Sequence, residues 1–145
     1  MKRLFTILIA CVMLLSVCGC NASALEIRYS DIPDSAWYAE AVYALRDRAI
    51  MDGTGNGRFS PDDTFTRAQL ATVLYRMAGK PAVNGEDGFT DTDSRTWYSD
   101  AVLWASQNGI VNGYGNGMFG TSDPTTQEQL YQNRMSVAMY SEPAR

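Results

Sequence analysis

The chain has 145 residues, of which 46% are hydrophobic, a formal net charge of −4 at pH 7 and no histidine. Without histidine it cannot form a Ser-His-Asp triad, a Cys-His dyad or a histidine zinc site. An acidic chain is also a poor match for nucleic acid, because that affinity comes mainly from basic contacts to phosphate.

The first 24 residues have the pattern of a secretory signal peptide. Lys2 and Arg3 give a basic start, residues 4–17 form a nearly unbroken apolar run, and residues 22–24 are small. The run is shorter than the about 20 apolar residues that a membrane span needs. We predict cleavage after Ala24, which exports the protein and leaves a formal charge of −6.

All three cysteines (Cys11, Cys18 and Cys20) lie within this leader. The exported chain would have none, which excludes a disulfide framework and a thiolate metal site. Residues 17–20 loosely resemble a bacterial lipobox in which Cys20 carries the lipid. Simple cleavage and a lipoprotein anchored through Cys20 are therefore alternative predictions.

The next element in chain order is a predicted amphipathic helix. Apolar residues recur there at three- and four-residue intervals: Tyr38, Ala41, Val42, Leu45 and Ala49. Asp34 or Ser35 is expected to cap its start, and the glycines at 53, 55 and 57 are expected to end it and open a tight loop. Phe59 then returns the chain to the core.

A second helix is predicted from Thr66, which forms a capping box with Gln69. Its apolar stripe consists of Leu70, Val73, Leu74 and Met77, and Gly79 ends it. Residues 80–88 contain Pro81 and three further turn residues (Asn84, Gly85, Gly88), so we interpret them as a linker. One helix pair has little surface to bury alone, and we therefore expect it to pack against a neighbour.

A shift of sixty residues superposes the chain on itself without a gap. It places Trp37-Tyr38 on Trp97-Tyr98, Gly55-Asn56-Gly57 on Gly115-Asn116-Gly117, and Gln69-Leu70 on Gln129-Leu130. We therefore predict a mainly α chain with two helix–loop–helix repeats, residues 25–79 and 89–145. The last helix of the second repeat is diverged, because Asn133 and Arg134 stand where Val73 and Leu74 face the core.

Several segments of the first repeat together resemble the S-layer homology (SLH) domain: Asp31-Ile32-Pro33, Ala36-Trp37-Tyr38, Asn56-Gly57-Arg58-Phe59 and Thr66-Arg67-Ala68-Gln69. The resemblance covers residues 29–79 and again 89–130. It implies a module that binds a secondary cell-wall polymer, often through a pyruvate-ketal sugar, and holds the protein non-covalently at the bacterial cell surface. Three such repeats commonly form a bundle, so other SLH-containing chains are possible partners.

Residue by residue, the resemblance implies a glycan site at Trp37, Gly53 and Arg67, and at Trp97, Gly109 and Gly113. Arg67 follows the predicted N-cap, where free backbone N–H groups and the helix dipole favour an anion. Its guanidinium would hold a carboxylate by two hydrogen bonds. Gln127 replaces this arginine in the second repeat, and Ala49 replaces the glycine matched by Gly109. We therefore expect the first repeat to carry most of the glycan affinity.

Two other functions compete with wall binding. Residues 52–63 place Asp52, Thr54, Asn56 and Asp63 where an EF-hand loop has its calcium ligands, but the second copy lacks several of these oxygens. A protein-interaction or assembly subunit of the cell surface is the other alternative, and Trp104, which has no counterpart in the first repeat, serves either a partner or the packing between repeats. Acidic pairs such as Asp62-Asp63 lie in turns, so we expect neither an enzyme nor a cofactor.

Overall fold

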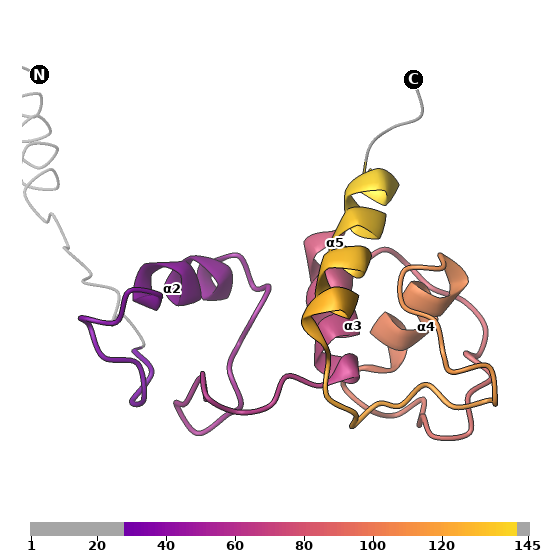
Figure 1. Cartoon of the computed structure of the whole chain (residues 1–145), viewed down its shortest axis with the longest axis horizontal. Helices are drawn as coiled ribbons and strands as arrows, with labels where there is room; N and C mark the ends of the chain where they lie inside the picture. The colour runs from indigo at the N-terminus through magenta and orange to yellow at the C-terminus, as the bar shows by residue number, and fades with distance from the viewer. Residues whose placement is uncertain (1–27, 142–145) are drawn as a thin grey trace, which may run out of the picture.

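The structure, a computed structural model, describes residues 28–141 (Figure 1). The predicted signal peptide and Cys20 lie outside these residues. The described helices are α2 (Ala39–Asp47), α3 (Arg67–Met77), α4 (Ser99–Gln107) and α5 (Gln127–Ser141), and they are joined by long loops. Between residues 28 and 141 there is no strand, only isolated bridges, so the mainly α prediction is confirmed. None of the helices in this part is long and apolar enough to cross a membrane.

The first helix of each repeat begins later than the sequence suggested. The N-caps of α2 and α4 are Tyr38 and Tyr98, and neither is capped by a side chain. Two successive turns bring the chain into α2, closed by hydrogen bonds from Ala36 N to the Pro33 carbonyl (2.9 Å) and from Ala39 N to the Ala36 carbonyl (3.0 Å). The predicted cap by Asp34 or Ser35 is wrong, because these residues lie inside the turns that precede the helix.

A left-handed residue, and not the glycine-rich loop, ends the first helix of each repeat. Ala49 (φ 53°) follows the C-cap of α2, and Gly109 (φ 65°) follows that of α4. The next amide in each repeat donates back to the helix, Ile50 N to the Leu45 carbonyl (2.9 Å) and Ile110 N to the Ala105 carbonyl (2.8 Å). The expectation that the glycines from 53 onward end α2 is wrong. A single residue in the left-handed conformation suffices to reverse the chain.

The capping box of α3 is confirmed. Thr66 N donates to Gln69 Oε1 (2.8 Å) and Gln69 N donates to Thr66 Oγ1 (3.3 Å). Thr126 and Gln129 exchange the same two bonds before α5, both at 3.2 Å. The other predicted boundary also holds, because α3 ends at Met77 and Gly79 follows with φ 83°.

One aspartate closes the loop of each repeat in the same way. Asp31 accepts hydrogen bonds from Phe59 N (2.8 Å) and Ser60 N (2.7 Å). Sixty residues later, Asp91 accepts from Phe119 N and Gly120 N, both at 2.7 Å. The repeat seen in the sequence is therefore also a repeat of hydrogen bonds.

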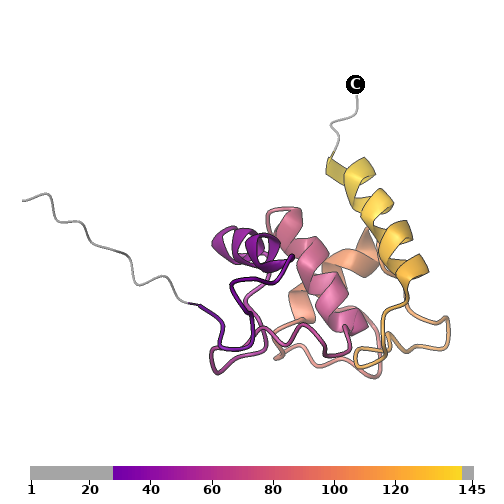
Figure 2. The ribbon, with the colours of Figure 1, turned by 60° about the vertical axis from the view of Figure 1, so that its left-hand side comes forward.

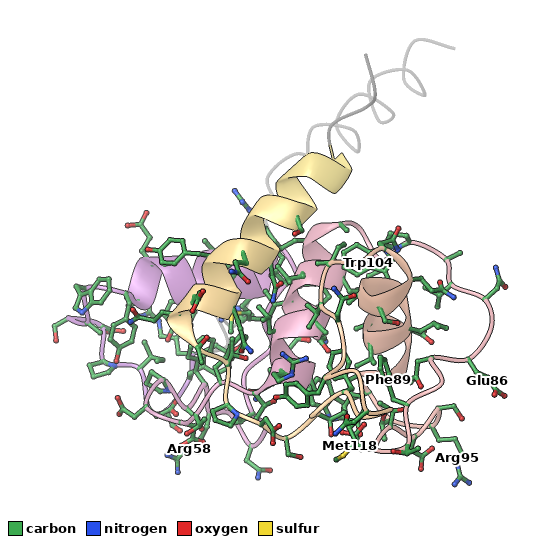
Figure 3. The ribbon with its side chains drawn as sticks, turned by 45° about the vertical axis from the view of Figure 1, so that its right-hand side comes forward. Arg58, Glu86, Phe89, Arg95, Trp104 and Met118 are labelled. Carbon is green, nitrogen blue, oxygen red and sulfur yellow. The ribbon has the colours of Figure 1, made fainter. Side chains whose placement is uncertain are left out.

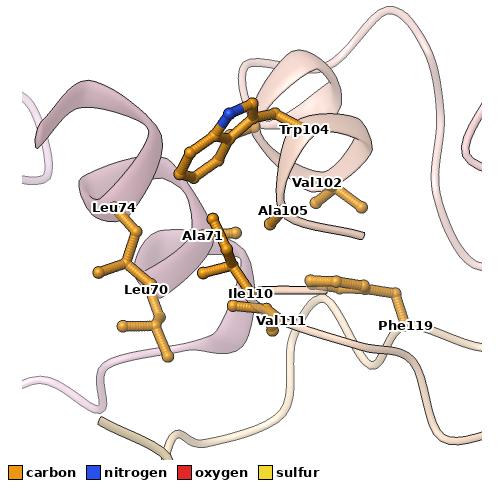
Figure 4. Packing of buried hydrophobic residues seen from close by; sticks show 10 residues of the cluster. Leu70, Ala71, Leu74, Val102, Trp104, Ala105, Ile110, Val111 and Phe119 are labelled. Atoms are coloured by element: carbon orange, nitrogen blue, oxygen red, sulfur yellow. The ribbon is translucent and has the colours of Figure 1, made fainter. Parts of the chain in front are cut away.

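The main core joins the two repeats, because α3 of the first packs against α4 of the second. Leu70, Ala71 and Leu74 of α3 meet Val102 and Ala105 of α4, together with buried residues of the loop that follows α4 (Ile110, Val111 and Phe119; Figure 4). Trp104 is buried in this cluster, with its ring 5.6 Å from that of Tyr75. The sequence left two roles open for Trp104, and the structure assigns it to the packing between repeats.

A smaller cluster lies under α2. It consists of Tyr29, Ile32, Ala39 and Val42. In Figure 1 this helix stands apart from the other three, and it packs against none of them. In Figure 2, α2 (indigo to purple) and α5 (yellow) lie on opposite sides of α3. The first repeat therefore has a helix without a helical neighbour in the described chain.

Candidate functional site

A groove of about 690 Å³ runs between the loop of the first repeat and α3. Residues 50–55 and 59–61 form one wall, and the opposite wall is a face of α3 that points away from α4. That face carries Gln69, Thr72, Val73 and Arg76, which are spaced by about one helical turn. Trp97, from the start of the second repeat, completes the lining. The groove is therefore a product of both repeats.

Trp97 presents an aromatic surface to this groove. Its side chain is 65% exposed, and its ring stands edge-on against that of Tyr98, with centroids 5.2 Å apart and an interplanar angle of 83°. The contact holds the indole in place while most of the side chain stays exposed. An exposed indole face of this kind is a suitable platform for the apolar face of a sugar ring.

Arg76 brings a positive charge to the groove. Its Nη1 lies 2.8 Å from Asp52 Oδ2 and donates to the carbonyl of Ile50 at 3.2 Å. Both bonds join α3 to the loop of the first repeat. The Asp52 carboxylate stays exposed, so the ion pair contributes little to stability and its arginine can exchange partners.

Hydroxyl and apolar groups make up most of the remaining lining. Thr54 Oγ1 and Ser60 Oγ are 2.8 Å apart, and Thr72 Oγ1 donates to the carbonyl of Ala68 at 2.8 Å. Ile50, Met51 and Phe59 add half-buried apolar surface. The lining also includes the carboxylates of Asp52, which pairs with Arg76, and of Asp63. The neutral hydrogen-bonding groups, the indole and the guanidinium in the rest of the lining suit a carbohydrate that carries a carboxylate.

The structure brings together only part of the predicted glycan site. Gly53 and Trp97 line the groove, whereas Trp37 does not and is 93% exposed, with its ring against Tyr38. Gly109 ends α4, as described above. Gly113 belongs to the loop of the second repeat and lies outside the groove lining.

Two of the predicted site glycines are needed for close packing in their loops. A Cβ at Gly53 would lie 2.3 Å from the carbonyl oxygen of Arg58, and one at Gly113 would lie 2.4 Å from Phe89 Cε1. Figure 3 shows Phe89 reaching into the second loop near Met118, whose carbonyl would be 2.7 Å from that same Cβ. These glycines therefore shape the loops, whatever the loops bind.

Arg67 lies in the first turn of α3, as predicted, but its side chain is turned into the second repeat. It is only 3% exposed. Nε donates to the carbonyl of Phe119 (2.9 Å), Nη2 donates to that of Asn112 (2.7 Å), and the guanidinium lies over the ring of Tyr114 (4.7 Å). This arginine fastens the second loop to α3. Its contact with a glycan stays a prediction.

Arg76, Thr72 and Ser60 line the groove but are not among the site residues predicted from the sequence. The signal for the α3 residues was the spacing of Gln69, Val73 and Arg76, which marks a second helix face beside the apolar stripe. Val73 was assigned to the core, yet it is half-buried and lines the groove. A face shared between packing and binding cannot be recognised by hydrophobicity alone.

The loop proposed as an EF-hand is held by contacts within the protein. Asp52 pairs with Arg76, and Thr54 bonds to Ser60. Within residues 28–141, no three Cys, Asp or Glu side chains gather closely enough to hold a metal ion. The calcium alternative stays a prediction that a chelator experiment would test.

The two repeats match a known protein family. The family model described as the S-layer homology domain matches residues 28–71 and 88–130. The chain belongs to the S-layer homology domain family and carries two of its repeats.

The relatives include proteins of bacterial surfaces. The cell surface protein of Thermoanaerobacter kivui is 32% identical over 109 residues, 72% of this chain and 14% of the relative. The surface-layer 125 kDa protein of Lysinibacillus sphaericus is 32% identical over 109 residues, 74% of this chain and 9% of the relative. An endoglucanase of Bacillus sp. (strain KSM-635) is 31% identical over 102 residues, 70% of this chain and 11% of the relative. The chain thus spans about a tenth of the length of these relatives.

Proposed function

We propose that this chain is a non-covalent cell-wall anchoring module whose groove binds a secondary cell-wall polysaccharide, a pyruvylated glycan in particular. Three findings support the proposal: the family match over both repeats, the surface-layer and cell-surface proteins among the relatives, and the groove itself. The observation that carries it is the exposed indole of Trp97 beside a groove that also contains Arg76.

The chemistry of the groove fits this ligand. A sugar ring would lie against the indole of Trp97, and the hydroxyls of Thr54 and Ser60 would exchange hydrogen bonds with those of the sugar. A pyruvate ketal adds a carboxylate, for which the guanidinium of Arg76 would leave Asp52. A charge-assisted hydrogen bond of this kind is worth about 1.5–3 kcal/mol, or about ten- to a hundredfold in affinity.

The repeat supplies a matched pair of variants to test the proposal. Trp97→Ala should weaken co-sedimentation with purified cell walls by about tenfold, because removal of an aromatic platform and its buried surface costs about 1–2 kcal/mol. Trp37→Ala removes the same residue from the same motif outside the groove, and binding should stay within about twofold. Equal losses for the two variants would contradict the assignment of the groove.

The nature of the polymer needs a second comparison. Walls stripped of their secondary polymer should no longer bind the protein. Walls that keep the polymer but lack its pyruvate groups should bind the wild-type protein weakly. The loss should equal that seen when intact walls are mixed with the Arg76→Gln variant. Undiminished binding to the stripped walls would defeat the polysaccharide proposal. Undiminished binding to the pyruvate-free walls would defeat only the role of the carboxylate.

A further inference from the structure

Five asparagines of the chain are each followed by a glycine: Asn56, Asn84, Asn108, Asn112 and Asn116. In such a pair the backbone nitrogen of the glycine can attack the side-chain Cγ of the asparagine, because glycine has a flexible backbone and no Cβ to obstruct the approach. An N–Cγ bond forms, the bond between Cγ and Nδ2 breaks, and ammonia leaves with the proton of the glycine amide. Water then opens the succinimide ring at either carbonyl, which yields aspartate or isoaspartate.

The fold controls how fast this ring closes. The asparagine side chain has to turn towards the glycine nitrogen, and the glycine N–H has to give up its proton, so a hydrogen bond to either group slows the reaction. The backbone between the two residues must also rotate, which close packing opposes. Pairs with the same sequence should therefore differ in reactivity according to their contacts.

Asn108 is held at both of its reacting groups. Its Nδ2 donates to the carbonyl of Trp104 (2.8 Å), and the amide of Gly109 donates to the carbonyl of Ser106 (3.1 Å). Both bonds belong to the end of α4, so the ring can close only after that helix end has opened. The loss of two hydrogen bonds should slow the reaction by about tenfold or more.

Asn112 is exposed, but the backbone that follows it is fixed. Its carbonyl accepts a hydrogen bond from Arg67 Nη2 (2.7 Å). Gly113 is packed so closely that a Cβ there would lie 2.4 Å from Phe89 Cε1. The rotation that brings the glycine nitrogen to Cγ is therefore opposed from both sides of the Asn112–Gly113 peptide bond.

Asn56 and Asn116 occupy the same turn of the two repeats, which makes them a matched pair. In the second repeat, Asn116 Oδ1 accepts a hydrogen bond from Met118 N (3.1 Å), which fixes the side chain. In the first repeat, neither the Asn56 side chain nor the amide of Gly57 has a hydrogen bond within the described residues. The repeat is thus protected in one copy and open to reaction in the other.

Asn84 and Gly85 lie in the linker between the repeats, and both are exposed. Among residues 28–141 no hydrogen bond involves the Asn84 side chain or the Gly85 amide. The Asn84 carbonyl accepts from Gln107 Nε2 (2.9 Å), a neutral bond at the surface that restrains the backbone weakly. Figure 3 shows Glu86, the next residue of this linker, at the outer edge of the molecule.

We infer that Asn56 and Asn84 are deamidation sites of the folded protein, whereas the fold protects the other three Asn-Gly pairs. Each event replaces a neutral amide with a carboxylate and consumes water alone. The modification is spontaneous, so its extent records how long the protein has been folded in solution.

Modification at Asn56 changes the loop that forms one wall of the groove. The turn around this residue is closed by Arg58 N, which donates to the Gly55 carbonyl (2.9 Å), and the Gly57 carbonyl accepts from Ser30 N (2.8 Å). Isoaspartate adds one carbon to the main chain inside the turn, so these bonds cannot keep their geometry. Gly55 lines the groove, and its displacement should weaken wall binding. This effect on binding rests on the proposed function, whereas the modification itself does not.

Peptide mapping of the intact protein measures the modification. The folded protein is incubated in mildly alkaline buffer, which favours loss of the glycine amide proton, and is then digested with trypsin and analysed by mass spectrometry. Asn56 and Asn84 fall in the tryptic peptides 49–58 and 77–95, and the protected asparagines fall in 96–134. Modification of the first two should be about tenfold or more faster than that of the others. In urea all five should react at similar rates, because a glycine follows each.

Variants connect the modification to the groove. Asn56→Gly removes the reacting amide and suits the left-handed backbone at this position (φ 50°). The freshly prepared variant should bind cell walls as the wild type does, because Asn56 is not part of the groove lining. After incubation the wild type should lose binding in proportion to its isoaspartate at position 56, and Asn56→Gly should keep it. Asn84→Gly is the matched control and should lose binding as the wild type does.

Two results of the peptide map would overturn the inference. One is equal modification of all five asparagines in the folded protein, and the other is faster modification of the three protected ones. Full wall binding by protein whose Asn56 has been converted to isoaspartate would overturn the effect on the groove. Fresh protein that binds no walls would defeat the proposed function, while the peptide map would still decide which asparagines react.

Discussion

Ala49 and Gly109 occupy the same position in the two repeats and have the same left-handed backbone, with φ 53° and 65°. Left-handed φ costs an L-residue with a Cβ about 1–2 kcal/mol, a cost that glycine avoids. Ala49→Gly should therefore raise the free energy of unfolding. Because glycine also has more conformational entropy in the unfolded chain, the net gain should be up to about 1 kcal/mol.

The reciprocal change is the control. Gly109→Ala should lower the free energy of unfolding by about 1 kcal/mol, and a Cβ there would meet no atom within 4 Å, so the backbone alone is tested. Urea denaturation of both variants checks the pair. Destabilisation by Ala49→Gly would show that the alanine side chain contributes more than its backbone costs.

Asp31 and Asp91 make stability sensitive to acid. Amides of Phe59 and Ser60 donate to the Asp31 carboxylate and hold its pKa below the usual value. Burial raises the pKa of Asp91, but the amides of Phe119 and Gly120 more than offset it and the net shift is downward. A lowered pKa stabilises the fold at pH values above the pKa of an aspartate in the unfolded chain, which is about 3.9. This stabilisation is lost as the pH falls through the pKa of the folded state.

Melting temperatures should therefore fall as the pH drops below about 4. Asp31→Asn should lower the melting temperature at neutral pH and reduce its dependence on acid, because an amide cannot accept both backbone N–H groups as a carboxylate does. Asp62→Asn, at an exposed turn position, is the matched control. An unchanged acid dependence in Asp31→Asn would remove this residue from the explanation.

The start of α3 is the element on which the second repeat depends. Arg67→Ala deletes two charge-assisted hydrogen bonds and leaves the carbonyls of Asn112 and Phe119 without these donors. Such losses add up to about 2–4 kcal/mol, so we expect a marked drop in the free energy of unfolding. Gln127 holds the equivalent position in α5 and lies in an exposed first turn. Gln127→Ala should therefore alter the free energy of unfolding by less than about 0.5 kcal/mol.

Wall binding separates the two roles of Arg67. If the residue is structural, binding by Arg67→Ala should recover at low temperature, where the variant is folded as judged by circular dichroism. A folded Arg67→Ala protein that still fails to bind would support the direct glycan contact predicted from the sequence.

Elements that are specified by neighbouring residues could be predicted from the sequence. The capping box of Thr66 and Gln69 and the stop at Gly79 depend on residues within a few positions of each other, and both are confirmed. The end of α2 was misplaced because Ala49 is not a residue that marks a left-handed position. The role of Arg67 could not be derived from its helix alone, since its partners lie more than forty residues away.

At the scale of the molecule, the sixty-residue period predicted two similar units but not how they pack. The first unit gives α3 to the core of the second, so α3 and α4 share the larger cluster and α2 is left with the smaller one. Hydrophobic patterns identified which residues are apolar. They carried no information on which repeat would cover them.

This unequal packing predicts unequal local stability. Amides of α2 should exchange with solvent faster than those of α4, because local opening of α2 exposes a cluster of only four buried residues, Tyr29, Ile32, Ala39 and Val42. The two helices have nine residues each and hold equivalent positions in their repeats, which makes them a matched pair. Intrinsic helix propensity favours slower exchange in α2 instead, since α2 contains three alanines, a glutamate and an arginine, whereas α4 contains two alanines, two serines and a tryptophan. Hydrogen exchange measured by mass spectrometry over residues 39–47 and 99–107 therefore separates packing from propensity. Slower exchange in α4 would show that the helix of the neighbouring repeat provides the protection, whereas slower exchange in α2 would mean that its stability does not require a docked helix.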